Sequence, residues 1–182
     1  MKNPYVVVDL EATCDDRGSV PRDESETIEI GAVLVDPTTL EAVDELQTFV
    51  RPVVHPRLTT FCTELTTITQ ADVDAAPTFA AAAARLATFG RNAVFCSWGA
   101  YDRVQLARDA HRCGIAPPLP GRHLNLKELF ARAAGDRRSV GNGRALGRVG
   151  LPRTGTHHRG IDDARNIARL LPYALGRVSI PS

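Results

Sequence analysis

The sequence predicts an α/β fold built on one sheet of mixed strand direction. Three segments rich in β-branched residues follow one another without an intervening helical pattern, at residues 5–10, 27–35 and 42–50. From residue 77 onward, helical patterns alternate with one further strand-like segment. A meander gives antiparallel neighbours and strand–helix alternation gives parallel ones, so a sheet that contains both has mixed direction.

The N-terminal segments are expected to form one buried strand and then a hairpin. Residues 5–10 form a short apolar run that is typical of a buried strand. The segments 27–35 and 42–50 are separated by Asp36-Pro37-Thr38-Thr39, which is a turn signal. These two segments should therefore pair antiparallel.

The rest of the chain predicts helices around a fourth strand at residues 93–97. A short helix is expected at 69–74, and Pro77 should open an alanine-rich helix that reaches about Phe89, because the first turn tolerates proline. Further helices are expected at 102–113, where Gly114 follows, at 124–134 and at 161–171. The glycine- and arginine-rich stretch 136–155 predicts only a short helix near 145–149.

Length and composition favour a single domain, residues 1–182, with a core of ordinary size. No stretch approaches a membrane span and the N-terminus enters a strand-like segment without a signal peptide, so no membrane partner is expected. The cysteines, at positions 14, 62, 96 and 113, form no CxxC pair. This scatter argues against zinc binding and against a disulfide framework, and favours a cytoplasmic location.

Charge is unevenly distributed, although the net charge is only +1. Residues 1–76 contain fifteen acids and five bases, whereas residues 129–161 contain one acid and seven arginines, at 132, 137, 138, 144, 148, 153 and 159. An acidic end and a basic end on one small domain suit the binding and cleavage of a polyanionic substrate. The alternative is a solvated arginine-rich surface.

Four carboxylates and one histidine, in three short segments, predict the chemistry of the site: Asp9, Glu11, Asp102, His158 and Asp163. Asp9 and Glu11 share a face because side chains alternate along a strand. Asp102 follows the fourth strand, and its i+4 neighbour Leu106 indicates that it faces inward. Four converging acids cannot all stay ionised without cations, so two Mg²⁺ or Mn²⁺ ions are expected as cofactors.

Each of these acids alone has an ordinary explanation, and the third segment allows two registers. His157 with Asp162 and His158 with Asp163 have the same spacing. Asp163 stacks with Ile167 on the core side of the helix, whereas Asp162 stacks with polar neighbours and is expected to cap the helix or face solvent. This register favours His158 and Asp163.

With these motifs, the chain resembles the DEDDh 3′–5′ exonucleases of the RNase T and proofreading-exonuclease superfamily, and within it the Eri-type (3′ histone-mRNA) exoribonucleases. The resemblance rests on residues 8–14 (VDLEATC), 49–52 (FVRP), 61–70 (FCTELTTITQ), 97–102 (SWGAYD) and 158–168 (HRGIDDARNIA). It implies an RNase H-like fold, with a five-stranded mixed sheet flanked by helices.

The resemblance also implies roles for individual residues. Asp9, Glu11 and Asp163 would ligate the metals, Asp102 would hold one mainly through water, and His158 would be the general base. The positions that match those holding the 3′-terminal nucleotide are Thr13, Leu65, Thr66 and Tyr101. Thr67 stands where glycine is usual, which bears on the backbone around the terminal sugar.

The implied function is a metal-dependent 3′–5′ exonuclease that shortens RNA or short single-stranded oligonucleotides and releases nucleoside 5′-monophosphates. Its partners would be single-stranded RNA or DNA 3′ ends, with arginines among residues 137–159 on the upstream phosphates. A DNA-directed proofreading or repair exonuclease is one alternative, since the choice depends on contacts to the 2′-OH. A binding module without chemistry is the other, and uncompensated carboxylates count against it. Cys14 is expected to be a small buried packing residue.

Overall fold

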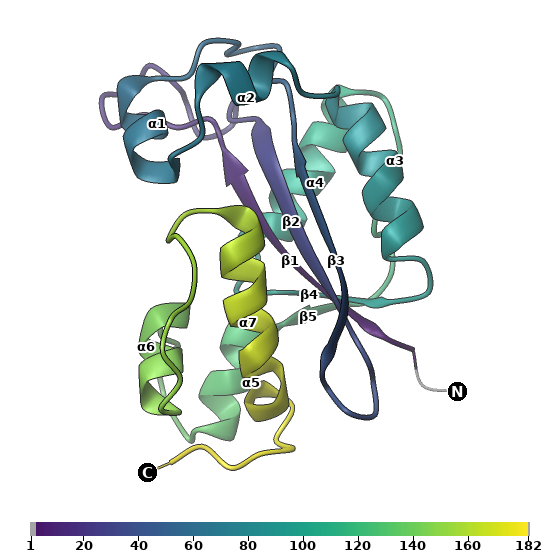
Figure 1. Cartoon of the computed structure of the whole chain (residues 1–182), viewed down its shortest axis with the longest axis vertical. Helices are drawn as coiled ribbons and strands as arrows, with labels where there is room; N and C mark the ends of the chain where they lie inside the picture. The colour runs from purple at the N-terminus through teal and green to yellow at the C-terminus, as the bar shows by residue number, and fades with distance from the viewer. Residues whose placement is uncertain (1–2, 182) are drawn as a thin grey trace.

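Five strands form one mixed sheet in the computed structural model, which describes residues 3–181 (Figure 1). The strands are β1 (Tyr5–Ala12), β2 (Thr27–Val35), β3 (Ala42–Phe49), β4 (Val94–Ser97) and β5 (His123–Asn125). Their order is β3-β2-β1-β4-β5, with β1–β2 and β2–β3 antiparallel, and β1–β4 and β4–β5 parallel. The predicted mixed sheet is confirmed.

The first three strands form the predicted meander. The carboxylate of Asp36 closes the β2–β3 turn by accepting hydrogen bonds from the N–H groups of Thr38 and Thr39, at 2.7 and 2.8 Å. β1 runs two residues beyond its predicted end, to Ala12. The extension matters because it keeps Glu11 within the paired part of the strand.

Seven helices are assigned within residues 3–181, and they cover both faces of the sheet (Figure 1). They are α1 (Thr60–Thr66), α2 (Gln70–Asp74), α3 (Phe79–Phe89), α4 (Tyr101–Arg112), α5 (Leu126–Ala133), α6 (Asn142–Arg148) and α7 (Gly160–Ala174). The helix α1 was not predicted. The helix predicted at 124–134 is shorter: its first two residues belong to β5 and residues 126–133 form α5, because Asn125 ends the strand and its side chain caps the helix.

The helix ends follow local capping rather than the predicted boundaries. α3 does not begin at Pro77: Thr78 is the N-cap, and its side chain accepts a hydrogen bond from the N–H of Ala81. Gly114 follows α4 with a φ of +66°, as its predicted role in ending that helix requires. α7 continues through Pro172 to Ala174, because a proline in the last turn removes one helical hydrogen bond without unwinding the rest.

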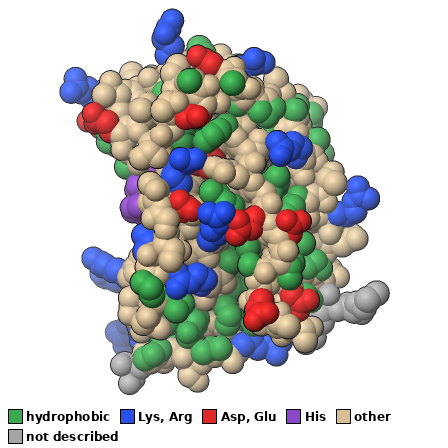
Figure 2. Space-filling view, viewed as in Figure 1, with side chains coloured by type: hydrophobic (Ala, Val, Ile, Leu, Met, Phe, Trp, Pro, Cys, Tyr) green, Lys and Arg blue, Asp and Glu red, His purple; other side chains and the backbone are tan. Residues whose placement is uncertain are grey.

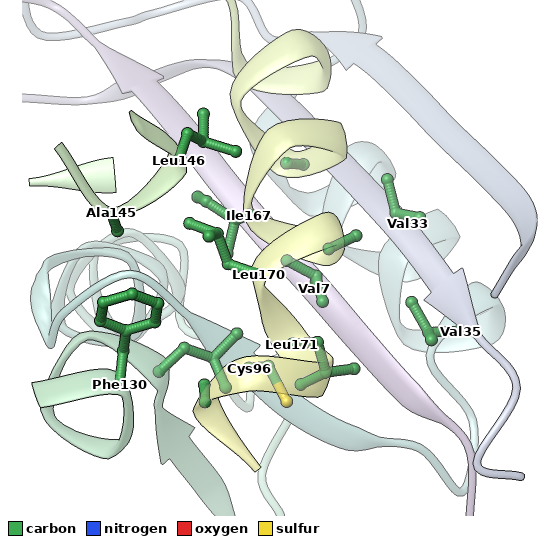
Figure 3. Close-up of a cluster of buried hydrophobic side chains, with 14 of the residues drawn as sticks. Val7, Val33, Val35, Cys96, Phe130, Ala145, Leu146, Ile167, Leu170 and Leu171 are labelled. Carbon is green, nitrogen blue, oxygen red and sulfur yellow. The ribbon is translucent and has the colours of Figure 1, made fainter. Parts of the chain in front are cut away.

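The core has two layers, one on each face of the sheet. Val7 of β1 packs with residues of α5, α6 and α7, including Phe130, Leu146 and Ile167 (Figure 3). Val6 and Val8 face the other way and pack against α3 and α4. Because side chains alternate along β1, Asp9 and Glu11 follow Val7 on the face that α7 covers.

Within residues 3–181, no helix combines the length and the apolar character needed to span a bilayer.

Candidate active site

Three carboxylates converge where β1 meets the start of α7; Glu11 and Asp163 are buried and Asp9 is partly buried. Asp9 and Glu11 come from β1, and Asp163 comes from the first turn of α7. One carboxylate oxygen of each residue lies within 4.8 Å of the corresponding oxygen of the other two. The structure therefore brings together two segments that are about 150 residues apart in the sequence.

Asp102 joins this cluster from the first turn of α4 and is 4% exposed. Its Oδ1 accepts a hydrogen bond from the N–H of Leu10 at 3.1 Å. Leu10 lies between Asp9 and Glu11, so this bond fixes α4 to the part of β1 that carries the acids. The inward orientation predicted from Leu106 is what the structure shows.

The electrostatics of the cluster favour either protonation of its carboxylates or the binding of cations between them. Burial, followed by the neighbouring carboxylates of Asp102 and Glu11, raises the pKa of Asp9 well above its ordinary value. Burial, with the charges of Asp163 and Glu29, raises the pKa of Glu11 to about 8. Burial also raises the pKa of Asp102 to about 6, against the opposing hydrogen bond from Leu10. An oxygen-only donor set in this state fits a hard divalent cation.

The loop before α7 orients Asp163. The backbone N–H of His158 donates to its Oδ2 at 3.0 Å, while Arg153 forms an ion pair at its Oδ1. Asn142 donates to the same Oδ1 at 3.4 Å and accepts from Arg153 at 2.6 Å. Neither Asn142 nor this contact of Arg153 was predicted, because nothing in the local sequence relates them to Asp163.

His158 lies on the wall of the same cleft, half-buried and with a positive φ of 59°. Its pKa is lowered from 6.5 by burial and then by the neighbouring His157. A neutral imidazole at physiological pH can accept a proton, as a general base must.

Asp162 points away from the cluster. Its Oδ2 accepts from the N–H of Thr156 at 2.8 Å, and its Oδ1 pairs with Arg165 at 2.9 Å. Asp162 was expected to cap the helix or face solvent; it does not cap the helix, because the N-cap residue of α7 is Arg159, and its side chain is partly exposed. Asn166, expected on a polar face, is fully buried and bonds to Thr154, so this side of the helix holds the loop rather than facing solvent.

Glu29 of β2 is a further residue of this region that the sequence did not indicate. It is 0% exposed and accepts hydrogen bonds from the N–H of Gly160 at 2.9 Å, Nε of Arg159 at 3.1 Å and Nε2 of Gln47 at 2.6 Å. A Cβ at Gly31 would lie 2.1 Å from the carbonyl carbon of Gly160. A glutamate within an apolar strand, two residues before a glycine, was the available signal.

A cleft of about 410 Å³ opens beside the acids. Of the residues expected to hold the terminal nucleotide, Leu65 and Tyr101 line it. Thr13 and Thr66 are buried and are not among its lining residues: the Thr13 hydroxyl accepts from the N–H of Glu26 at 2.9 Å, and the Thr66 hydroxyl donates to the carbonyl of Cys62 at 2.8 Å.

Thr67 has a φ of +61° and forms the C-cap of α1. Glycine suits this conformation, and a β-branched residue is strained in it. The backbone therefore takes the form that glycine would give, at some cost in conformational energy.

Cys14 also lines the cleft and is half-buried, more exposed than expected. A hydrogen bond with Cys62, together with burial, raises the pKa of the Cys14 thiol. A protonated thiol is a poor nucleophile, so the thiol chemistry rejected from the sequence remains unsupported.

Three arginines that were expected to hold phosphates are engaged in ion pairs. Arg148 pairs with Asp136, Arg153 with Asp163, and Arg159 with Glu29. Among residues 3–181, the arginines at 137, 138 and 144 form no ion pair and are exposed. Figure 2 shows acidic and basic side chains interleaved across the waist of the molecule.

A five-stranded mixed sheet with this acidic centre defines an exonuclease domain of the RNase H-like fold. Residues 6–171 match the RNase T exonuclease family, and the chain belongs to that family.

Several relatives and solved structures agree with this assignment. The chain is 32% identical to mouse ERI1 exoribonuclease 3 over 185 residues, covering 92% of this chain and 52% of the relative. It is 32% identical to the Drosophila melanogaster 3′-5′ exonuclease Snipper, covering 92% and 69%. The nuclease domain of 3′hExo, a DEDDh family member bound to rAMP, superimposes with a TM-score of 0.86 at 28% identity, covering 99% and 96%. The chain spans about half the length of the ERI1 exoribonuclease 3 relatives.

Proposed function

We propose that this chain, as one domain over residues 1–182, is a metal-dependent 3′–5′ exonuclease that removes nucleotides from RNA 3′ ends and releases nucleoside 5′-monophosphates. The observation that carries the proposal is the convergence of Asp9, Glu11 and Asp163, with oxygens within 4.8 Å of one another beside an open cleft. The exoribonuclease names of relatives at 31–32% identity support RNA as the substrate.

The carboxylates of Asp9, Glu11 and Asp163 would hold two Mg²⁺ or Mn²⁺ ions, with Asp102 acting mainly through water. Such ions lower the pKa of the attacking water and offset negative charge at the phosphate and the leaving oxygen. The raised pKa values of Asp9, Glu11 and Asp102 support this assignment, because they measure how unfavourable the ionised cluster is by itself. Oxygen donors select a hard cation over a soft one.

His158 would take the proton from the attacking water. Its neutral ring lies on the cleft wall, and its own N–H holds Asp163 in place. The base and one metal ligand are thereby kept in a fixed relation, which favours a productive arrangement of water and phosphate.

Leu65 and Tyr101 would contact the 3′-terminal nucleotide, since both line the cleft. Thr13 and Thr66 would act indirectly, by fixing the backbone through the hydrogen bonds described above. The unpaired arginines 137, 138 and 144 lie on either side of Gly141 and Asn142, which line the cleft, and would hold upstream phosphates.

The proposal is tested with 5′-labelled single-stranded RNA and DNA of the same sequence, each incubated with Mg²⁺, Mn²⁺ or EDTA. A ladder of successively shorter RNA products that requires metal supports the proposal. Faster shortening of DNA than of RNA would favour the DNA-directed alternative. Binding without any shortening would favour the non-catalytic module, and one internal cut would contradict exonucleolytic action.

A further inference from the structure

A second set of metal-ligating side chains lies in the loop that precedes α7. His157, His158 and Asp163 each offer one ligand atom, and these three atoms lie within 4.8 Å of one another. The two imidazole rings have centroids 3.8 Å apart and planes inclined at 32°. Figure 2 shows histidine side chains at the surface on the left of the waist, where solutes can reach them.

The donor set of this group differs from that of the acidic cluster. Asp9, Glu11 and Asp163 offer only oxygens, whereas this group offers two imidazoles and one carboxylate. Imidazole nitrogen suits Zn²⁺ and similar transition-metal ions, and hard cations prefer oxygen. Three protein ligands with one position left to water form a common open zinc site.

Only a small movement is needed to bring the three ligand atoms to the spacing that one zinc ion requires. Zinc–ligand bonds of about 2 Å in tetrahedral geometry place two ligand atoms about 3.3 Å apart. The three ligand atoms lie within 4.8 Å of one another, so they need to approach by at most about 1.5 Å. His157 is exposed, and residues 149–159 lie outside helices and strands. A rotation of the His157 side chain can therefore supply the change without moving α7.

Asp163 keeps a position for a cation although Arg153 lies beside it. Arg153 opposes a cation, but it contacts Asp163 at Oδ1, together with Asn142. In the described residues, the hydrogen bond to Oδ2 comes from the backbone of His158, so that oxygen keeps a free lone pair.

We propose that His157, His158 and Asp163 form a binding site for a transition-metal cation such as Zn²⁺, and that its occupation inhibits hydrolysis. Inhibition follows because the ion engages a ring nitrogen of His158 and an oxygen of Asp163. The inhibitory part rests on the proposed exonuclease function, whereas zinc binding does not.

Binding is tested by calorimetric titration of Zn²⁺ into the purified protein in excess Mg²⁺, which competes with Zn²⁺ for the oxygen-only cluster. The wild-type protein should bind one Zn²⁺ per chain, and His157→Ala should weaken binding on the order of tenfold or more. His111→Ala, at an exposed histidine near the end of α4, is the matched control and should bind as the wild type does. Equal zinc affinity in wild type and His157→Ala would overturn the proposal.

Inhibition is tested on labelled RNA in the same buffer, with added Zn²⁺. With each protein's rate taken relative to its own zinc-free rate, His157→Ala should need on the order of tenfold more Zn²⁺ than the wild type for half-inhibition. Unchanged inhibition of His157→Ala would place the zinc among the acids and overturn the proposal. Zinc binding that depends on His157 in a protein without nuclease activity would sustain the site while refuting the proposed function.

Discussion

The buried carboxylate of Glu29 accepts a hydrogen bond from the N–H of Gly160 at 2.9 Å, across 131 positions of sequence. Gly160 is the first residue of α7, and Asp163 follows three residues later. Glu29 pairs across the sheet with Glu11 of β1. This one bond therefore sets where the acid from α7 stands relative to the acids from β1.

Replacing Glu29 by alanine should weaken both folding and metal binding. The change leaves Arg159 and the Gly160 N–H without their buried partner, which costs about 3–5 kcal/mol of unfolding free energy. Glu29→Gln keeps a hydrogen-bond acceptor for the N–H of Gly160 and should lose less stability and less metal affinity. Urea unfolding and Mn²⁺ titration measure the two effects.

Glu45→Ala is the matched control, because Glu45 pairs with Arg165 of the same helix at the surface. It should cost less than about 1 kcal/mol and leave Mn²⁺ affinity unchanged. If folded Glu29→Ala bound Mn²⁺ as tightly as the Glu45→Ala protein does, Glu29 would have no role in positioning the acids.

Asp163→Asn should nearly abolish cleavage, whereas Asp162→Asn should keep most of it. The two carboxylates are adjacent in sequence, but only Asp163 lies with Asp9 and Glu11. Rates on 5′-labelled RNA in saturating Mg²⁺ provide the comparison, with circular dichroism as the check on folding. The opposite ranking would show that the other register carries the chemistry.

His158→Ala should lower the rate on the order of a hundredfold or more, with little change in KM, since a general base acts in the chemical step. The pKa of His158 lies below 6.5, so the wild-type rate in saturating metal should rise with pH through a midpoint below that value. This rise of the rate with pH should be absent in His158→Ala. A pH profile identical in both proteins would exclude His158 as the base.

Without metal, the protein should become less stable as pH rises. The pKa of Glu11 is raised from 4.5 to about 8 and that of Asp102 from 3.8 to about 6, so the folded state holds these protons more tightly than the unfolded state. Their stabilisation is complete below the unfolded values and is lost as pH rises through 6 and then 8. Melting temperatures in EDTA between about pH 4 and pH 9 measure it.

Two comparisons identify the acidic cluster as the cause. Saturating Mg²⁺ should remove most of the loss of stability at high pH, because the bound metal offsets the carboxylate charge that protons offset at low pH. Asp9→Asn should melt higher than wild type in EDTA at neutral pH, since it removes one of the crowded charges. A wild-type melting temperature that rises from pH 5 to pH 8 in EDTA would contradict the raised pKa values.

The double substitution Arg137→Ala with Arg138→Ala should weaken RNA binding and reduce its salt dependence. Each lost phosphate contact should lower the slope of log affinity against log salt by about one. Arg177→Ala, beyond the far end of α7, is the control. Equal salt slopes in the three proteins would show that the upstream phosphates lie elsewhere.

Much of this architecture followed from short-range patterns. The meander was predicted because Asp36 and Pro37 mark a turn between two β-branched runs, and the register of Asp163 was predicted because Ile167 marks the buried face of its helix. β5 was missed as a strand because three residues are too few to show a period, and its last residue already caps α5.

The acids of the site could be proposed from the sequence, but the residues that hold them in position could not. Asp9, Glu11, Asp102 and Asp163 stand beside recognisable strands and helices, and the family resemblance connected them. The partners of Asp163 and Gly160, by contrast, are Arg153, Asn142 and Glu29, which meet them only through tertiary packing. Arginines 148, 153 and 159 were assigned to phosphates because a sequence does not reveal which charges neutralise each other within the fold.

The contact of Gly31 with Gly160 makes motif searches alone an unsafe guide to activity in this family. A homologue or an engineered chain could keep every metal-binding acid and the histidine, yet carry alanine at position 31. One added methyl group there would meet the α7 backbone at 2.1 Å and push the helix away from the sheet. Such a chain would carry every motif residue of the family and would nevertheless lack nuclease activity.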